Sequence, residues 1–164
     1  MNTPSTFDKT EQLLENQGFT IVSRNEEKPW GGYFVIEETQ APKFIEAFFP
    51  SLSAKDFVGF DKLSPKFLMV APGKRLSWQY HHRRAEVWRL IDGVAGVVTS
   101  PTDEEGPLHK LELGELVTLK CGERHRLVGL ENGWGILAEI WQHMDKSKPS
   151  DEEDIVRVQD DFGR

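Results

Sequence analysis

The sequence predicts an all-β protein, an antiparallel sandwich or barrel preceded by one short helix. From residue 66 onward, short runs of Val, Ile, Leu and aromatic residues recur at the regular spacing typical of such folds. Dipeptides such as Pro72-Gly73 and Asn132-Gly133 mark the turns between these runs. The chain has 164 residues, of which 38% are hydrophobic, so we expect one domain with a substantial core.

The first third of the chain supplies a helix and two strands. Residues 6–17 contain good helix formers, and Gly18 is a residue type that commonly ends a helix. Phe19–Arg24 and Gly32–Glu38 are predicted strands because β-branched and aromatic residues predominate in them. The apolar run Phe44–Phe49 forms either a short helix or a segment laid on the core.

The rest of the chain is predicted to form eight short strands and a polar tail. The strands span residues 66–71, 75–81, 86–91, 94–99, 108–113, 116–120, 125–130 and 135–141. In the tail, the acidic run Asp151–Asp154 is predicted to be a solvated loop. The single domain, 1–164, is thus divided into a helical extension 1–18, a barrel core 66–141 and a C-terminal segment 145–164 that packs on the barrel.

Composition restricts the class of function. The formal net charge of −7 disfavours nucleic acid as a partner, because a phosphate backbone would be repelled. The single cysteine, Cys121, cannot form an internal disulfide, as is usual in a reducing compartment, and we expect it to be a small buried apolar residue. The polar N-terminus lacks a signal-peptide core, and no apolar run reaches the roughly 18 residues of a membrane span. We therefore expect a cytoplasmic protein without membrane contact.

Two further residue groups are predicted to be structural. Gly31 follows a tryptophan and precedes a second glycine, which indicates a tight backbone approach or a bulge. Four tryptophans are expected in the core rather than as platforms for a sugar: Trp30, Trp78, Trp88 and Trp141.

The segment from residue 72 to residue 93 carries the most chemical information. Gln79 and His81 alternate along a predicted strand, so their side chains face the same side. Glu86 would join them if a turn or bulge around Arg83–Ala85 reset the register, and His125 follows on a later strand. Two imidazoles, one carboxylate and one amide oxygen suit a divalent first-row metal such as Zn, Mn, Fe or Co, with positions left open.

At these residues the sequence resembles the cupin superfamily. The first cupin motif is Gly, five residues, His-x-His, three or four residues, Glu, six residues, Gly. It maps onto Gly73, Gln79, His81, Glu86 and Gly93, with Gln in place of the first His. The spacing matches, so the resemblance implies a jelly-roll β-barrel with metal ligands at Gln79, His81 and Glu86.

The second cupin motif is also present. It is Gly, five residues, Pro-x-Gly, two residues, His, and it maps onto Gly114, Lys120-Cys121-Gly122 and His125, with Lys in place of Pro. The resemblance therefore implies that His125 is the fourth metal ligand.

A closer resemblance is to the type II phosphomannose isomerases. That family has Pro-Trp-Gly before the cupin motifs, a Leu-Ser-x-Gln core and an Ile-Val-Arg ending. This chain has Pro29-Trp30-Gly31, then LSWQYHHRRAEVW at 76–88 and EEDIVRVQDDFGR at 152–164, so the similarity covers residues 28–164. The family has Gln at the position of Gln79. The chain departs from it at Arg83 and Val87, where the family has His, which puts the pocket wall and the substrate in question.

The resemblance implies an isomerase that converts mannose 6-phosphate to fructose 6-phosphate through an enediolate. It implies a divalent metal, zinc first, with Mn, Fe, Co or Ni as alternatives, and a homodimer. Many members carry an N-terminal nucleotidyltransferase domain, but no glycine-rich phosphate loop precedes Pro29, so only the isomerase half is expected.

Residues for proton transfer and for phosphate binding are less well defined. Arg84, Lys66 and Glu139 lie near the motifs and are the candidate catalytic residues, with Arg84 matching the family's arginine. A phosphate needs a cationic clamp, for which the candidates are Lys66, Arg126, Arg157 and Arg164.

Three other functions remain open. The first is an isomerase of another sugar phosphate, such as a heptose phosphate, which would apply if the pocket wall differs from that of the family. An iron-dependent cupin dioxygenase would use the same His and carboxylate ligands and require oxygen. A cupin that binds sugar without turnover would do so independently of metal and of Glu86.

Overall fold

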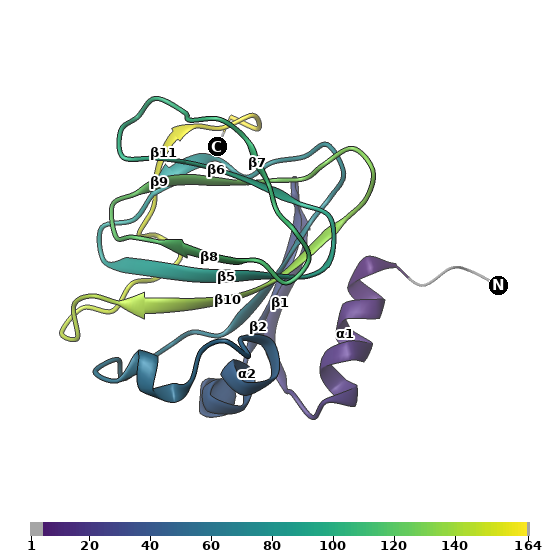
Figure 1. Cartoon of the computed structure of the whole chain (residues 1–164), viewed down its shortest axis with the longest axis vertical. Helices are drawn as coiled ribbons and strands as arrows, with labels where there is room; N and C mark the ends of the chain where they lie inside the picture. Colours follow the sequence, from purple (N-terminus) through teal and green to yellow (C-terminus); the bar gives the residue numbers. More distant parts are fainter. Residues whose placement is uncertain (1–4, 164) are drawn as a thin grey trace.

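The computed structural model describes residues 5–163, and within them two antiparallel β-sheets face each other (Figure 1). The larger sheet has the order β1-β2-β3-β10-β5-β8. Its strands are, in the same order, Ile21–Lys28, Gly31–Ile36, Lys66–Val70, Gly135–His143, Arg84–Gly93 and Leu116–Leu119. The smaller sheet has the order β11-β4-β9-β6-β7. Its strands are Val156–Gln159, Trp78–Tyr80, Arg124–Val128, Gly96–Ser100 and His109–Lys110. This is the predicted all-β jelly-roll architecture.

The helices lie on the outer side of the larger sheet, away from the smaller sheet (Figure 1). Helix α1, Thr6–Asn16, begins at Ser5, whose hydroxyl accepts from the backbone N–H of Asp8 while the Asp8 carboxylate caps Ser5 in return. Helix α2, Ala41–Phe48, contains most of the predicted Phe44–Phe49 run and so decides that alternative in favour of a helix. Two short 3₁₀ turns flank it, η1 at Glu38–Gln40 and η2 at Ala54–Phe57.

The larger sheet buries a different hydrophobic cluster on each of its faces. Strand β3 is buried along its whole length, and its alternating residues enter both clusters. Phe67 packs with Phe44 and Phe48 of α2 in the outer cluster, with ring centroids 5.7 and 4.8 Å apart. Leu68 packs with Trp88 in the inner cluster. The inner face of the larger sheet therefore lines the interior of the barrel, where the motif residues lie.

Several strands differ from their predicted lengths. The strand expected at 75–81 is only three residues long, and the one at 108–113 only two. Strand β11 was not predicted, because its sequence is polar and three of its four residues are exposed; pairing with β4 holds it in the sheet. The four tryptophans are buried, as predicted. Gly31 has φ +144°, and a Cβ there would lie 2.0 Å from the carbonyl oxygen of Met69, which confirms the close approach.

Two burial predictions were wrong. Cys121 is exposed at the turn after β8, where its Sγ lies 3.2 Å from the carbonyl oxygen of His82. In the acidic run, Asp154 is buried although the three residues before it are exposed. Its carboxylate accepts hydrogen bonds from backbone amides, which offset the cost of removing it from water.

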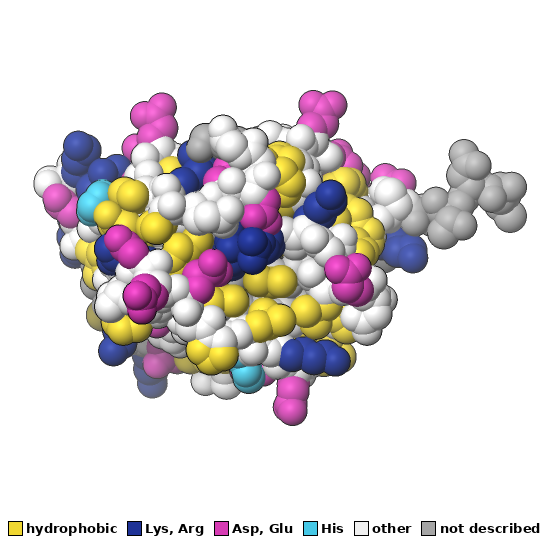
Figure 2. All heavy atoms as spheres, turned by 90° about the horizontal axis from the view of Figure 1, so that it is seen from above, with side chains coloured by type: hydrophobic (Ala, Val, Ile, Leu, Met, Phe, Trp, Pro, Cys, Tyr) yellow, Lys and Arg dark blue, Asp and Glu magenta, His cyan; other side chains and the backbone are white. Residues whose placement is uncertain are grey.

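The surface carries charges of both signs. On the face seen from above in Figure 2, over the β11 and β6 side of the molecule, Lys and Arg side chains are interspersed with Asp and Glu side chains and with apolar groups. Within residues 5–163, no helix is both long and apolar enough to cross a membrane.

Candidate metal centre

The predicted metal ligands meet between the two sheets. Gln79 lies on β4 and is the register partner of His125 on β9, both in the smaller sheet. His81 follows β4 directly, and Glu86 lies on β5 in the larger sheet. Of the two predicted alternatives, a turn or a bulge, the structure has a turn: the chain bends at residues 82–83 and passes from one sheet to the other between residues 81 and 84. Glu86 thus approaches His81 from the facing sheet.

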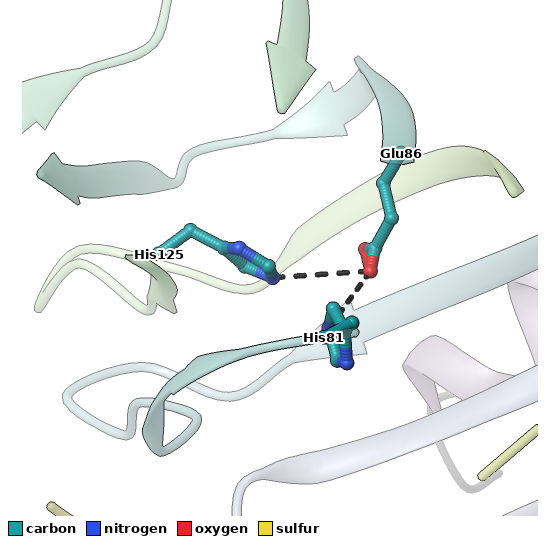
Figure 3. Close-up of side chains that lie close together, drawn as sticks. All are labelled: His81, Glu86 and His125. Atoms are coloured by element: carbon teal, nitrogen blue, oxygen red, sulfur yellow. Dashed lines mark ion pairs between the residues drawn. The ribbon is translucent and has the colours of Figure 1, made fainter. Parts of the chain in front are cut away.

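The ligand atoms converge closely. Oε2 of Glu86 lies 3.0 Å from Nε2 of His81 and 3.8 Å from Nε2 of His125 (Figure 3). One donor atom from each of these three residues lies within 4.8 Å of the others, and all three residues are buried. Three electron-pair donors so close together, away from water, form an arrangement that a divalent cation stabilises.

Each imidazole is oriented by a hydrogen bond on its far side. Nδ1 of His81 lies 2.6 Å from the carbonyl oxygen of Asp154, and Nδ1 of His125 lies 3.1 Å from that of Glu123. A carbonyl oxygen only accepts, so Nδ1 carries a proton in both rings. In the neutral rings, Nε2 is then the unprotonated nitrogen and faces the centre, as metal-binding histidines require.

The protonation states also suit a cation. Burial is the main cause that lowers the pKa of His125 to about 4, so its ring is neutral near pH 7. Burial raises the pKa of Glu86, but the positive charge of the neighbouring Arg84 guanidinium outweighs this effect and holds the pKa well below its usual range. Nε2 of His125 is buried and has no hydrogen-bond partner among residues 5–163. A bound metal ion would satisfy this orphaned atom, so the donor set fits a divalent metal.

Gln79 reaches the centre through its amide. Its Nε2 lies 3.4 Å from Nε2 of His81, and its Oε1 accepts from the hydroxyl of Ser77 at 2.6 Å. Rotating the amide by half a turn would point the oxygen at the centre and let the amide nitrogen donate to Ser77, because a hydroxyl also accepts. The structure thus brings Gln79 to the centre with its amide nitrogen, not its oxygen, facing the histidine.

Arg84 is a buried cation in contact with the ligands. Its Nε donates to Oε2 of Glu86 at 3.0 Å, and its Nη2 lies 3.2 Å from Nε2 of His81. The guanidinium stacks on Trp141 at 3.5 Å and donates through Nη1 to Ser150 and to the carbonyl of Asp151. These contacts place a fixed positive charge beside the centre.

A cavity of about 70 Å³ opens beside the ligands. The three candidate catalytic residues, Arg84, Lys66 and Glu139, all line it. Glu139 accepts from the indole N–H groups of Trp88 and Trp141 at 2.7 and 2.8 Å. Burial, followed by the charge of Glu86, raises the pKa of Glu139 to about 8. Lys66 is buried and forms an ion pair with Glu152 at 2.7 Å.

The candidate phosphate-binding residues are distributed differently. Arg157 is exposed and lines the cavity. Arg126 does not line it: its buried guanidinium donates to Leu76, Glu105 and Gln159 and ties β9 to neighbouring segments. Arg164 lies outside the described residues. Lys28 lines the cavity and was missed, because nothing in the sequence but its place before the Pro-Trp-Gly motif marks it out.

The two departures from the family pattern lie away from the cavity. Val87 is buried in the outer cluster, on the other face of β5 from Glu86 and Trp88. Arg83 lies beside Asp151 and Asp154, with nitrogen–oxygen distances of 3.6 and 3.8 Å. Neither residue is among those that line the cavity, so the expected change in the pocket wall does not follow from them.

Comparison with known proteins gives a family match. Residues 55–160 match the family model described as mannose-6-phosphate isomerase C-terminal. A mannose-1-phosphate guanylyltransferase of Salmonella montevideo is 28% identical over 152 residues, covering 92% of this chain and 26% of that protein. The xanthan biosynthesis protein XanB of Xanthomonas campestris is 30% identical over 137 residues, covering 84% of this chain and 23% of that protein. The chain thus spans about a quarter of the length of these curated relatives.

A solved structure shows the same fold. The capsular polysaccharide assembling protein CapF of Staphylococcus aureus aligns with a TM-score of 0.55 at 13% identity, covering 84% of this chain and 34% of CapF. At this identity the likeness concerns the fold alone.

Proposed function

The chain belongs to the family of C-terminal mannose-6-phosphate isomerase domains, and from this premise we propose that it is a metal-dependent sugar-phosphate isomerase. We propose mannose 6-phosphate and fructose 6-phosphate as its substrate and product. The observation that supports this most strongly is the convergence of His81, Glu86 and His125 beside a cavity that also contains an acid–base candidate, Glu139. Aldose–ketose isomerisation needs these two elements together, a polarising centre and a proton carrier.

The metal would be held by His81, Glu86 and His125, with the amide of Gln79 as a fourth ligand after rotation. Zinc is our first choice, with Mn, Fe, Co or Ni as alternatives, because this mixed nitrogen and oxygen set suits all of them. When bound, the ion supplies polarisation of the sugar's adjacent oxygens and stabilises the negative charge of the enediolate.

Glu139 is the proposed proton carrier. Its two indole hydrogen bonds fix the carboxyl group at the cavity wall, and a pKa raised to about 8 makes it a stronger base than an ordinary glutamate. It would take the proton from C2 of the aldose and return it to C1. Arg84 and Lys66 contribute positive charge on the same wall.

Arg157 and Lys28 are the proposed phosphate-binding pair. Both line the cavity, Arg157 is exposed, and Lys28 is half-buried, so both can meet an incoming anion. Replacing Arg157 with Ala should raise KM for the sugar phosphate more than it lowers kcat. Lys110→Ala, which removes an exposed cation on β7 that does not line the cavity, is the matched control. An unchanged KM in the Arg157 variant would remove this residue from the clamp.

Proton NMR of mannose 6-phosphate in D₂O tests the proposed activity. The protein is incubated with zinc or manganese, and a chelator is then added. We expect fructose 6-phosphate to appear, and deuterium to enter C2 of recovered mannose 6-phosphate, only while metal is present. Absence of both signals with a folded, metal-loaded protein would reject mannose 6-phosphate as the substrate, and other sugar phosphates would be compared next.

A further inference from the structure

Asp154 is the one buried residue of the acidic run in the C-terminal segment. Its side chain is 0% exposed, whereas the side chains of Asp151 and Glu152 are each 60% exposed. A carboxylate that is removed from water must be matched by hydrogen-bond donors. The identity of these donors shows what the residue does.

The Asp154 carboxylate holds the backbone immediately after His81. Oδ1 accepts the backbone N–H of His82 at 2.9 Å, and Oδ2 accepts that of Arg83 at 3.0 Å. Oδ2 also accepts the hydroxyl of Ser150 at 2.6 Å. The carboxylate therefore satisfies two amides at the point where the chain crosses from one sheet to the other, and no strand pairing could satisfy them there.

The backbone of the same residue holds the His81 ring. The carbonyl oxygen of Asp154 lies 2.6 Å from Nδ1 of His81 and accepts a hydrogen bond from its N–H. Asp154 thus contacts His81 on two sides, through the ring and through the following peptide groups. Since the carbonyl and the carboxylate belong to one residue, the position of the carboxylate fixes that of the carbonyl.

We propose that Asp154 is a positioning residue for the metal centre. Its carboxylate anchors residues 82–83, and this anchoring presents its own carbonyl to Nδ1 of His81, so that Nε2 remains unprotonated and faces Glu86. The proposal rests on the metal site proposed above, although the state of the His81 ring can be measured without metal. Partners that orient a ligating histidine are commonly worth tenfold to a hundredfold in metal affinity.

The other histidine provides an internal comparison. Nδ1 of His125 is held by the carbonyl of Glu123, two residues earlier and just before β9, and makes no contact with Asp154. A change at Asp154 should therefore alter His81 selectively. A general loosening of the barrel would alter both rings.

The experiment combines zinc affinity with histidine NMR. Zinc dissociation constants are measured by chelator competition for the wild type, for Asp154→Asn and for Glu153→Gln. The last variant also loses one negative charge, but from an exposed neighbour. We expect Asp154→Asn to bind zinc about tenfold to a hundredfold more weakly, and Glu153→Gln to stay within about twofold of the wild type.

In metal-free protein at about pH 8, above the pKa of a free imidazole, ¹⁵N spectra report which nitrogen of each ring is protonated. We expect Nδ1–H for His81 and His125 in the wild type, and a change confined to His81 in Asp154→Asn.

The outcomes separate the two proposals. A wild-type His81 protonated on Nε2 overturns the positioning role, whether or not any variant folds. Unchanged zinc affinity and an unchanged His81 tautomer in folded Asp154→Asn also overturn it. If that variant does not fold, the wild-type His81 tautomer decides by itself. A wild type with the expected tautomer but no zinc binding rejects the proposed metal site, and leaves the orientation of His81 by Asp154 standing.

Discussion

The two histidine ligands should have opposite effects on stability when each is replaced by leucine in the absence of metal. Nε2 of His125 is buried without a partner, and an unsatisfied buried polar atom costs about 1–3 kcal/mol. The ring's hydrogen bond to Glu123, at 3.1 Å, offsets about 1 kcal/mol of this cost. His125→Leu removes both contributions, so we expect the metal-free variant to be as stable as the wild type or up to about 2 kcal/mol more stable.

His81 is hydrogen-bonded on both sides. Its Nδ1 donates to Asp154, and its Nε2 lies within hydrogen-bonding distance of Nη2 of Arg84. Leucine at this position leaves a buried carbonyl and a buried guanidinium N–H without their partner. We therefore expect His81→Leu to destabilise the metal-free protein by about 2–4 kcal/mol.

Urea unfolding in excess chelator measures both free energies of unfolding, and chelator competition measures zinc binding in parallel. Both variants should lose zinc affinity, but only His81→Leu should also lose stability. The pair therefore distinguishes a loss of metal binding from a loss of folding free energy. If His125→Leu proves as destabilised as His81→Leu, the orphaned nitrogen of His125 is not the costly atom that the structure indicates, and the argument for a cation between the ligands loses its main support.

Three further predictions follow from individual contacts. Glu152→Gln should lower KM for a sugar phosphate in steady-state assays, because the Glu152 carboxylate lines the cavity and its negative charge repels the substrate phosphate; a raised KM would show that the carboxylate instead aids binding. His143→Gln should make the free energy of unfolding depend less steeply on pH between about pH 6.5 and 4. Burial lowers the pKa of His143 to about 4, so as the pH falls the unfolded chain binds a proton before the folded chain does, and this residue lowers wild-type stability by up to about 1.4 kcal/mol per pH unit. An equal slope in variant and wild type would contradict this. Gly31→Ala should lower the free energy of unfolding by more than about 1 kcal/mol, since its φ of +144° is strained for any other residue and the new Cβ would lie 2.0 Å from the Met69 carbonyl; an unchanged urea midpoint would show that the strand relaxes freely.

The sequence predicted most of the strands, and it predicted that His81, Glu86 and His125 would lie close together. Gln79, His81 and His125 lie at motif spacings, and their strands alternate in the way that places them on one side. For Glu86 the sequence predicted a turn or a bulge, and the structure has the turn, but the sequence did not predict that this turn leads into the other sheet. Periodicity describes a single strand, and the crossover between His81 and Arg84 changes the sheet, which no spacing within one segment can reveal.

Residues whose role depends on burial were harder to assign. Asp154 and Glu153 are neighbours of the same charge, and only the backbone amides that face Asp154 distinguish them. Arg126 and Arg157 both followed strong motifs, but the first is enclosed by three oxygen acceptors while the second is free to face the cavity. Sequence pattern indicates which residues can carry a charge. The fold decides which of those charged groups already have hydrogen-bond partners within the protein.

The metal centre therefore depends on more than the barrel core predicted at 66–141. Strand β11 pairs with β4, the strand that carries Gln79, so residues 156–159 support one proposed ligand from the edge of the sheet. Asp154 orients a second, His81, and Ser150 reaches Arg84 with its hydroxyl. These contacts all come from a segment that is polar and largely exposed, and that contributes little to the hydrophobic clusters. Its length and its acidic composition make more sense as a support for the proposed ligands than as a covering for the core, because Asp154 and Ser150 together contact each of the residues 81–84.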